Sequence, residues 1–212
     1  MTFGSQLLSR NEICIIDYGL GNLRSVENGL KAVGAMVRVV TTPEDITSAT
    51  RLLLPGVGSF NMGMKKLKER NLVDAVCLAA KKGTPLLGIC LGMQLLSSFG
   101  DEGGNTQGLG LIPGAVKRLS PYAGLHIPHM GFNEVFPLVA SPLFKCISDG
   151  SDFYFVHSYC MAVDREEDAL AYAEYGEKFI VAVRRDNVYG TQFHPEKSQS
   201  QGLQLLKNFF AI

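Results

Sequence analysis

The sequence predicts an α/β fold in which a mostly parallel, doubly wound central sheet with flanking helices is followed by a β-rich second half. In the first half, short apolar segments alternate with helical patterns, an order typical of parallel sheets with helices on both faces. In the second half, short β-rich segments follow one another, separated by turns. No internal repeat, low-complexity tract or linker interrupts the 212 residues. We therefore expect a single domain over 1–212, with residues 1–11 as a poorly ordered N-terminal extension.

The first half is expected to hold four buried strands, at 12–17, 36–40, 51–54 and 85–89. Helical patterns lie between them, at 23–33, 60–70 and 72–82. Gly34 and Gly83 follow two of these helices, and glycine is common just past a helix end because it adopts positive φ without strain. Thr42 followed by Pro43 is typical of a helix start, with an N-cap side chain before a proline at the first helical position.

The second half is expected to hold six strands, at 115–119, 134–136, 153–157, 169–174, 179–184 and 188–193. The last two are separated only by Arg185-Asp186-Asn187, which predicts a hairpin. A terminal helix is expected over 199–210, where apolar residues including Leu206 and Phe210 recur at helical spacing. In doubly wound sheets the reactive groups lie at the carboxyl ends of strands, so motifs at these ends matter most.

Composition narrows the class of protein. Lysine plus arginine and aspartate plus glutamate both number 20, and no basic stripe favours nucleic-acid binding. No apolar run approaches the ~18 residues of a membrane span, and residues 1–10 lack the pattern of a secretory signal. The five cysteines are scattered and form no CxxC pair, so we expect neither a zinc site nor a disulfide framework. A cytoplasmic protein that binds neither nucleic acid nor membranes is expected.

Gly88-Ile89-Cys90-Leu91-Gly92 places a thiol where the fourth expected strand turns into a helix. A nucleophile flanked by glycines at such a turn matches the nucleophile-elbow pattern. The first N–H groups of the following helix, and its dipole, favour a thiolate and an oxyanion formed beside it. The alternative is a structural cysteine packed at the edge of a buried sheet.

His194-Pro195-Glu196 supplies a base and a carboxylate. In an extended chain, residues two apart point to the same side, about 6.5 Å apart along the backbone. The Glu196 carboxylate can then reach one imidazole nitrogen of His194 while the other nitrogen faces a nucleophile. Pro195 lacks an N–H and is expected to end the strand ladder there. The alternative is a surface histidine near a glutamate.

Pro55-Gly56-Val57-Gly58 follows the third expected strand and offers backbone donors. Glycine on either side of Val57 makes rotation of the peptide inexpensive. The N–H of Val57 or Gly58, together with that of Leu91, is therefore a candidate oxyanion hole. The alternative is an ordinary tight turn.

Taken together, GICLGMQLL, the downstream HPE and the PGVG loop resemble the class I (triad) glutamine amidotransferases, in that family's order and over most of the chain. Within this family the chain is most similar to glutaminase subunits of imidazole glycerol phosphate synthase. The stretches that carry this resemblance are DYGLGN from Asp17, LPGVGSF from Leu54, PHMGFN from Pro128, YFVHSY from Tyr154 and HPEKS from His194.

The resemblance implies a role for each matching residue. Cys90 would attack the side-chain amide of glutamine to form a γ-glutamyl thioester, with His194 as base and acid and Glu196 orienting it. Substrate contacts are implied for Gly56, Gln94, Glu102, Tyr154, His157 and Ser158. No metal and no cofactor are implied.

The resemblance also implies a heterodimer in which a (β/α)₈-barrel cyclase subunit receives the ammonia for histidine biosynthesis. The candidate contacts to this partner are Asn22, Phe132, Asn133 and Lys197. The family usually has tryptophan where this chain has Phe132, so the contact is expected to differ there. Two alternatives remain: a paralogous subunit that supplies ammonia for amination of a surface-polysaccharide sugar, and a non-catalytic regulatory subunit. The intact Cys90, His194 and Glu196 argue against the second.

Overall fold

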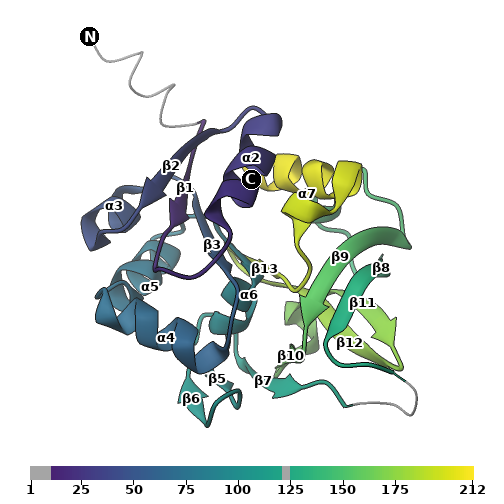
Figure 1. Ribbon diagram of the computed structural model, residues 1–212. Helices are drawn as coiled ribbons and strands as arrows, with labels where there is room; N and C mark the ends of the chain where they lie inside the picture. Colours follow the sequence, from purple (N-terminus) through teal and green to yellow (C-terminus); the bar gives the residue numbers. More distant parts are fainter. Residues whose placement is uncertain (1–10, 121–124) are drawn as a thin grey trace.

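The computed structural model describes residues 11–120 and 125–212 (Figure 1). The extension expected at 1–11 therefore lies outside the described residues, apart from Asn11. The described part contains a nine-stranded sheet in the order β2-β1-β3-β4-β13-β12-β11-β8-β9 and a four-stranded sheet in the order β10-β7-β5-β6. The predicted α/β class, with a large central sheet and flanking helices, is confirmed.

Five parallel strands build one half of the large sheet: β2 (Met36–Val40), β1 (Glu12–Ile16), β3 (Leu52–Gly56), β4 (Leu86–Cys90) and β13 (Val188–Thr191). The first four match the predicted strands to within two residues at each end. β13 returns from the far end of the chain and pairs in parallel with β4, with Thr191 opposite Ile89. This pairing brings the segment that carries His194 beside Cys90.

The second half continues the same sheet with antiparallel strands: β12 (Glu177–Arg185), β11 (Ala169–Tyr175), β8 (His129–Pro137) and β9 (Ser151–His157). The strand predicted at 134–136 is the middle of the longer β8, and the strand predicted at 188–193 ends at Thr191. The predicted hairpin is present, and Asp186 in its turn has φ 52°, a left-handed conformation that aspartate tolerates in such loops.

The smaller sheet contains β5 (Phe99–Gly100), β6 (Thr106–Gln107), β7 (Gly114–Arg118) and β10 (Tyr159–Val163). Only β7 was predicted. β5 and β6 are too short to leave a periodic pattern. β10 follows β9 after one residue, Ser158, so the sequence contains no turn cluster where the chain changes sheet.

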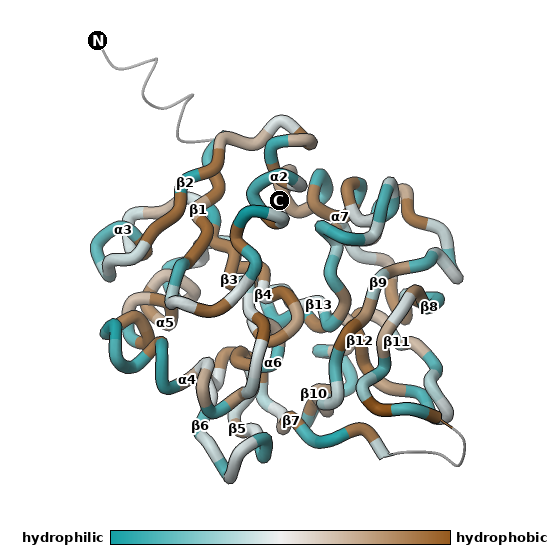
Figure 2. The backbone as a smooth tube through the Cα atoms, in the orientation of Figure 1, coloured by the Kyte–Doolittle hydropathy of each residue, from teal (hydrophilic) through white to brown (hydrophobic). Residues whose placement is uncertain are grey.

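Helices cover both faces of the parallel half: α2 (Leu23–Ala32) and α7 (Gln199–Ala211) on one, α3 (Pro43–Ser48), α4 (Phe60–Glu69) and α5 (Val73–Lys81) on the other. Short 3₁₀ turns lie at Pro142–Phe144, Glu166–Asp168 and Pro195–Lys197. β1 alternates between the two faces, because Ile13 and Ile15 pack under α2 and α7 whereas Cys14 and Ile16 pack with α3, α4 and α5. The tube in Figure 2 is accordingly brown along the central strands. Among the described residues, no helix is long and apolar enough to cross a membrane.

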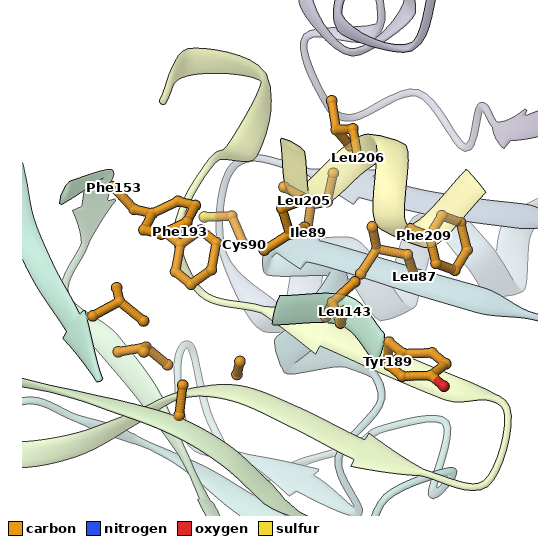
Figure 3. Close-up of a cluster of buried hydrophobic side chains, with 14 of the residues drawn as sticks. Leu87, Ile89, Cys90, Leu143, Phe153, Tyr189, Phe193, Leu205, Leu206 and Phe209 are labelled. Carbon is orange, nitrogen blue, oxygen red and sulfur yellow. The ribbon is translucent and has the colours of Figure 1, made fainter. Parts of the chain in front are cut away.

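One of the two core clusters extends to the nucleophile. Leu205, Leu206 and Phe209 of α7 are fully buried and belong to the same cluster as Leu87 and Ile89 of β4. Cys90 is the next residue and lies beside Phe193 at the end of this cluster (Figure 3). The strand that delivers Cys90 is thus fixed by close packing against the terminal helix.

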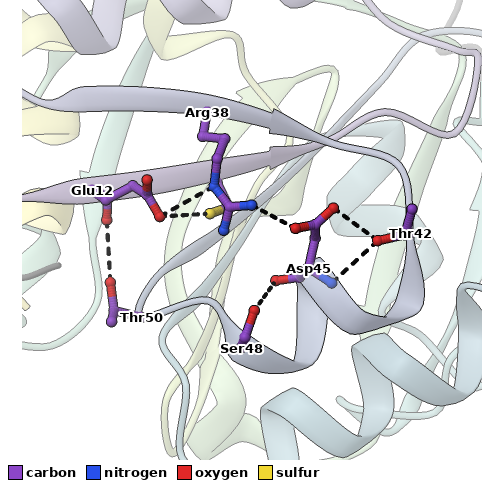
Figure 4. A network of polar contacts seen from close by, with 7 residues as sticks. Glu12, Arg38, Thr42, Asp45, Ser48 and Thr50 are labelled. Carbon is purple, nitrogen blue, oxygen red and sulfur yellow. Dashed lines mark hydrogen bonds and ion pairs between the residues drawn. The ribbon is translucent and has the colours of Figure 1, made fainter.

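A polar network joins β1, β2 and α3 at the opposite edge of the sheet (Figure 4). Arg38 pairs with Glu12 at 3.3 Å and with Asp45 at 2.6 Å. Thr42 caps α3 by accepting the backbone N–H of Asp45 at 3.2 Å, as the Thr42-Pro43 pair predicted. These side chains are partly exposed, so water screens both pairs and they chiefly fix the start of α3.

Candidate active site

Cys90 lies at a sharp turn between β4 and the short helix α6 (Leu91–Leu95). Its backbone has φ 55° and ψ −112°, which residues with a side chain rarely adopt. Such strain persists only where the surrounding structure enforces it, and it is typical of functional positions. The turn predicted from the flanking glycines is present, and it projects the thiol from the carboxyl end of a central strand.

Both flanking glycines are required by close packing. A Cβ at Gly88 would lie 2.7 Å from backbone atoms of Gly92 and Met93. A Cβ at Gly92 would overlap the carbonyl oxygen of Leu54 in β3. The turn at Cys90 therefore packs closely against its own backbone and against β3. Neither Gly88 nor Gly92 can be replaced by a residue with a side chain unless the backbone moves.

His194 and Glu196 form the expected pair, but by a different backbone path. The prediction placed both residues on one face of an extended strand. In the structure β13 ends at Thr191, and Pro195 begins a 3₁₀ turn that contains Glu196. The turn folds the Glu196 carboxylate back, so that Oε1 lies 2.8 Å from His194 Nδ1. Both side chains are almost fully buried, with exposures of 4% and 2%.

The surroundings of His194 favour its protonated form. Burial acts against the imidazolium, but the nearby Cys90 and the hydrogen-bonded carboxylate of Glu196 outweigh it and raise the pKa of His194 to about 9. Nε2 is buried without a hydrogen-bond partner among the described residues, on the side of the ring that interacts with Cys90. His194 is thus arranged to take the thiol proton through Nε2 while Glu196 fixes the tautomer through Nδ1.

A cavity of about 480 Å³ opens beside the thiol. Its lining includes eight of the residues predicted for the site: Val57, Gly58, Cys90, Leu91, Gln94, Glu102, His157 and Ser158. Ser59, Pro128, Val156 and Tyr159 complete the wall. Gly56 and Tyr154 are outside the set of described residues that line this cavity, so their substrate contacts remain predictions. A cavity of this size accommodates a small amino acid such as glutamine.

Glu102 combines an acidic side chain with a structural task. Its Oε2 accepts the backbone N–H of Phe60 at 2.9 Å, at the start of α4. The N-cap residue Ser59 makes no such bond with its own side chain, so Glu102 satisfies a donor that the helix leaves free. Burial raises the pKa of Glu102, and the bond from Phe60 opposes this. A cationic group in the cavity would have the opposite effect to burial, which suits the predicted contact to an α-ammonium.

The candidate oxyanion loop begins level with the nucleophile. In the register of β3 and β4, Gly56 lies opposite Cys90, so Val57 and Gly58 are the first residues beyond the sheet. Gly58 has φ 115°, and no atom of residues 11–120 or 125–212 lies within 4 Å of the place that a Cβ would occupy, which leaves this peptide room to rotate. Leu91, the third predicted donor, is the first residue of α6.

Three of the predicted partner and substrate residues form one surface cluster outside the cavity. The Phe132 ring, which is 50% exposed, meets the Tyr154 ring edge-on at 5.6 Å between centroids. Lys197 Nζ lies 5.6 Å from the centre of the same Tyr154 ring. Asn22 lies elsewhere, where its side chain caps α2 through the N–H of Ser25 at 3.2 Å.

Two buried polar residues beside the thiol were not predicted. Gln192 is fully buried, and its Nε2 lies 3.8 Å from Cys90 Sγ. The Tyr18 hydroxyl has no hydrogen-bond partner among the described residues and closely approaches Gly56. Burial, and then the neighbouring Cys90, raise the pKa of Tyr18 far above its usual value. The sequence signal for Gln192 is its position two residues before His194, which in an extended segment places both on the same side.

The fold and the site together define a class of thiol-dependent amidotransferases. The chain belongs to the family Glutamine amidotransferase class-I, whose model matches residues 14–212. It is 51% identical over 198 residues to imidazole glycerol phosphate synthase subunit HisH of Moorella thermoacetica, covering 93% of each chain. It is 48% identical to subunit HisH 1 of Campylobacter jejuni, covering 93% of this chain and 98% of the relative, and 46% identical to subunit HisH 2 of Pseudomonas aeruginosa, covering 94% and 99%.

Solved structures support the fold at much lower sequence identity. A crystal structure of a glutamine amidotransferase matches with a TM-score of 0.71 at 20% identity, covering 94% of this chain and 99% of that chain. The structure of PurLQS from Thermotoga maritima matches with a TM-score of 0.73 at 16% identity, covering 94% and 97%. At such identities the likeness shows the fold alone.

Proposed function

We propose that this chain is the glutaminase subunit of an imidazole glycerol phosphate synthase and releases ammonia from glutamine at Cys90. The observation that carries the proposal is the buried His194–Glu196 pair at 2.8 Å, with the free Nε2 on the side of Cys90. An acyl-transfer site needs a nucleophile, a base and an orienting group in this arrangement. The relatives at 46–51% identity are all subunits of that synthase by name.

The reaction follows from this arrangement. Nε2 of His194 takes the Cys90 proton, and the sulfur attacks the glutamine carboxamide carbon to form a tetrahedral oxyanion. The C–N bond breaks as His194 returns the proton to the departing nitrogen, which leaves as ammonia and yields a γ-glutamyl thioester. Water, deprotonated by His194, then attacks the thioester and releases glutamate and the Cys90 thiol. The N–H groups of Val57 or Gly58, and of Leu91, stabilise the oxyanion both when the thioester forms and when it is hydrolysed.

Ammonia set free into water at neutral pH is protonated and no longer nucleophilic, which gives a physical reason for a partner subunit. The proposed partner is a (β/α)₈-barrel cyclase docked on the face that carries Phe132, Asn133 and Lys197, with Asn22 as a further contact. Docking would also set the Gly56–Gly58 loop, whose peptides can rotate at little cost. We expect the isolated chain to hydrolyse glutamine slowly, and the partner with its own substrate to raise this rate.

The test compares two nitrogen sources. With the cyclase subunit present, Cys90→Ser should abolish glutamine-dependent product formation and leave the ammonia-dependent reaction intact. Cys146→Ser, which changes an exposed cysteine away from the cavity, is the matched control and should retain both reactions. Glutamine-dependent turnover by Cys90→Ser at the parental rate would remove Cys90 from its proposed role.

A second function, ammonia supply for amination of a surface-polysaccharide sugar, is favoured by Phe132. This exposed ring stands where the family usually has tryptophan, and it lacks the indole N–H that a partner could accept. Relatives named HisH 1 and HisH 2 also indicate that some organisms hold more than one such subunit. The two functions share the chemistry at Cys90 and differ in the acceptor. Measuring glutaminase stimulation by each barrel partner with its own substrate separates them.

A further inference from the structure

Gln192 holds a side-chain amide against the nucleophile. The residue follows β13, is fully buried, and donates its backbone N–H to the Val181 carbonyl at 2.8 Å. Its side chain makes two contacts: Nε2 lies 3.8 Å from Cys90 Sγ, and Oε1 accepts a hydrogen bond from Gln94 Nε2 at 3.0 Å. A fully buried amide with both ends bonded is fixed in place.

The direction of this amide follows from its neighbours. The carbonyl oxygen of Tyr159 can only accept, and Gln94 lies 2.9 Å from it, so the NH₂ group of Gln94 must face that oxygen. The same NH₂ group faces Gln192, which must therefore present its oxygen to Gln94 and its own NH₂ group to the sulfur. Reversing Gln192 would bring two NH₂ groups together and turn a carbonyl oxygen toward Sγ.

Sγ of Cys90 consequently lies between a hydrogen-bond acceptor and a hydrogen-bond donor. The Val156 carbonyl oxygen, 4.0 Å away, can accept a hydrogen bond from the thiol but repels a thiolate. The Gln192 N–H can donate to the sulfur in both forms and bonds more strongly to the anion. Gln192 thus offers the thiolate a side-chain donor, separate from the backbone N–H groups proposed for the oxyanion.

We propose that Gln192 is a positioning residue for Cys90, with Gln94 as its anchor: its amide orients the sulfur and stabilises the thiolate that attacks the substrate. The proposal rests on the proposed function of Cys90 as nucleophile. Gln94 also lines the cavity, so a substrate that contacts Gln94 acts on the same pair of amides that orients the thiol. The role is distinct from the His194–Glu196 pair, which moves the proton.

The test uses two variants of similar size. Gln192→Met removes the donor and nearly preserves the volume, and Gln192→Glu replaces the donor with an oxygen. Gln204→Met is the matched control, because Gln204 Nε2 also bonds to another side-chain amide, that of Asn208 at 2.8 Å, but in α7 away from the thiol. The readout is the rate of Cys90 alkylation by iodoacetamide between pH 5 and 9 in the isolated folded chain, measured by mass spectrometry of the Cys90 peptide.

Since a hydrogen bond to a charged group is lost, we expect Gln192→Met to slow alkylation about tenfold at pH 6 and to shift the midpoint of the profile upward by about one pH unit. Gln192→Glu should shift it further. With the barrel partner, kcat for glutamine should fall about tenfold with KM changed less than about twofold. An alkylation midpoint for Gln192→Met equal to that of the parent and of Gln204→Met would overturn the proposal, and Gln192→Glu decides the question if the methionine variant does not fold.

Alkylation needs neither glutamine nor a partner, so this result is independent of the proposed function. A parental chain without glutaminase activity in any complex would refute the function alone. An unchanged midpoint in Gln192→Met and Gln192→Glu, with an active parent, would refute the role of Gln192 alone.

Discussion

His129 Nδ1 lies 3.0 Å from His157 Nε2 across the antiparallel pair of β8 and β9. His157 Nδ1 lies 2.8 Å from the Tyr159 carbonyl oxygen, which can only accept, so Nδ1 of His157 carries the proton and Nε2 accepts. His129 must then donate through Nδ1 and accept through Nε2, which faces the Asn133 NH₂ group at 3.3 Å. One tautomer of each ring therefore satisfies every hydrogen bond in this series. The series runs from Asn133, a candidate partner contact, to Tyr159 in the wall of the cavity.

Acid should destabilise the fold through these two rings. Burial lowers the pKa of His129 to about 4 and that of His157 to about 3. In the unfolded chain both titrate near 6.5, so below this pH the unfolded state binds more protons and the free energy of unfolding falls as pH drops from about 6.5 toward 4. The slope should reach about 1.4 kcal/mol per pH unit for each ring, as measured by urea unfolding at several pH values.

The variant His129→Gln isolates one ring. Between pH 6.5 and 5, this substitution should reduce the slope of the free energy of unfolding against pH by about the contribution of one histidine. The reduction is expected whatever the effect of the substitution on stability at pH 7. His126→Gln changes an exposed histidine nearby and should leave the slope as it is. Equal slopes in the parent and in His129→Gln would contradict the buried neutral ring.

His194 should act in the opposite direction in alkaline solution. Its raised pKa of about 9 means that the folded state binds more protons than the unfolded state between about 6.5 and 9. The stabilisation is fully present below 6.5 and is lost as pH rises through 9. In Glu196→Gln the imidazolium loses its carboxylate, so the pKa of His194, followed by NMR titration, should fall.

The same Glu196→Gln substitution should lower kcat with the partner by roughly 10²- to 10⁴-fold, the range for loss of correct acid–base function. Glutamine retains the volume of the buried side chain, so the fold should persist. Glu69→Gln, which changes an exposed glutamate of α4, is the control and should keep the parental kcat. A kcat for Glu196→Gln within threefold of the parent would remove Glu196 from the site.

Gly58→Ala tests the loop beside the thiol. Gly58 and Gly83 have φ of 115° and 88°, and in the described part of the chain neither has an atom within 4 Å of the position of an added Cβ. Alanine at either should therefore cost a similar stability, about 1–2 kcal/mol from backbone strain. Only Gly58→Ala should also reduce partner-stimulated kcat, on the order of 100-fold if an oxyanion donor is misplaced. Stopped assays of both variants, with their unfolding midpoints, separate the two effects.

Phe132→Ala tests the partner face. Phe132 and Phe99 are both 50% exposed, so truncating either should leave the fold intact. If Phe132 and its neighbour Tyr154 contact the barrel, Phe132→Ala should raise the Kd of the complex roughly tenfold or more, as measured by calorimetry. Phe99→Ala, in the small sheet, should not change Kd. Identical Kd values for the two variants would remove Phe132 from the contact.

Local signals were enough to predict much of the fold. Gly34, Gly83 and Thr42 mark helix ends because capping depends on only a few neighbouring residues, and all three act as predicted. The elbow at Cys90 was likewise predictable, since its glycines reflect clashes within one turn and with the adjacent strand.

Long-range features were not predictable from sequence patterns. Pairing of β13 with β4 sets the place of His194, and no local pattern encodes which distant strands pair. The folded-back turn at Pro195 replaced the predicted extension because the chain leaves the sheet at Thr191, where His194 bonds instead to the Tyr154 carbonyl at 2.9 Å. Alternation places Gln192 on the same side as His194, but its contacts with Gln94 and Cys90 are known only from the folded structure.

The overlap that a side chain at Gly92 would make with Leu54 has a consequence for regulation. Gly92 lies directly against β3, and Gly56 of β3 is paired opposite Cys90 of β4, so the thiol and the start of the Gly56–Gly58 loop are held in register, while Glu102 anchors the far end of that loop at Phe60. Any change between an inactive and an active conformation of the loop is therefore confined to the few peptide groups between Gly56 and Phe60. A partner that binds the working arrangement more tightly by only about 2.7 kcal/mol would shift this equilibrium 100-fold without bending the sheet.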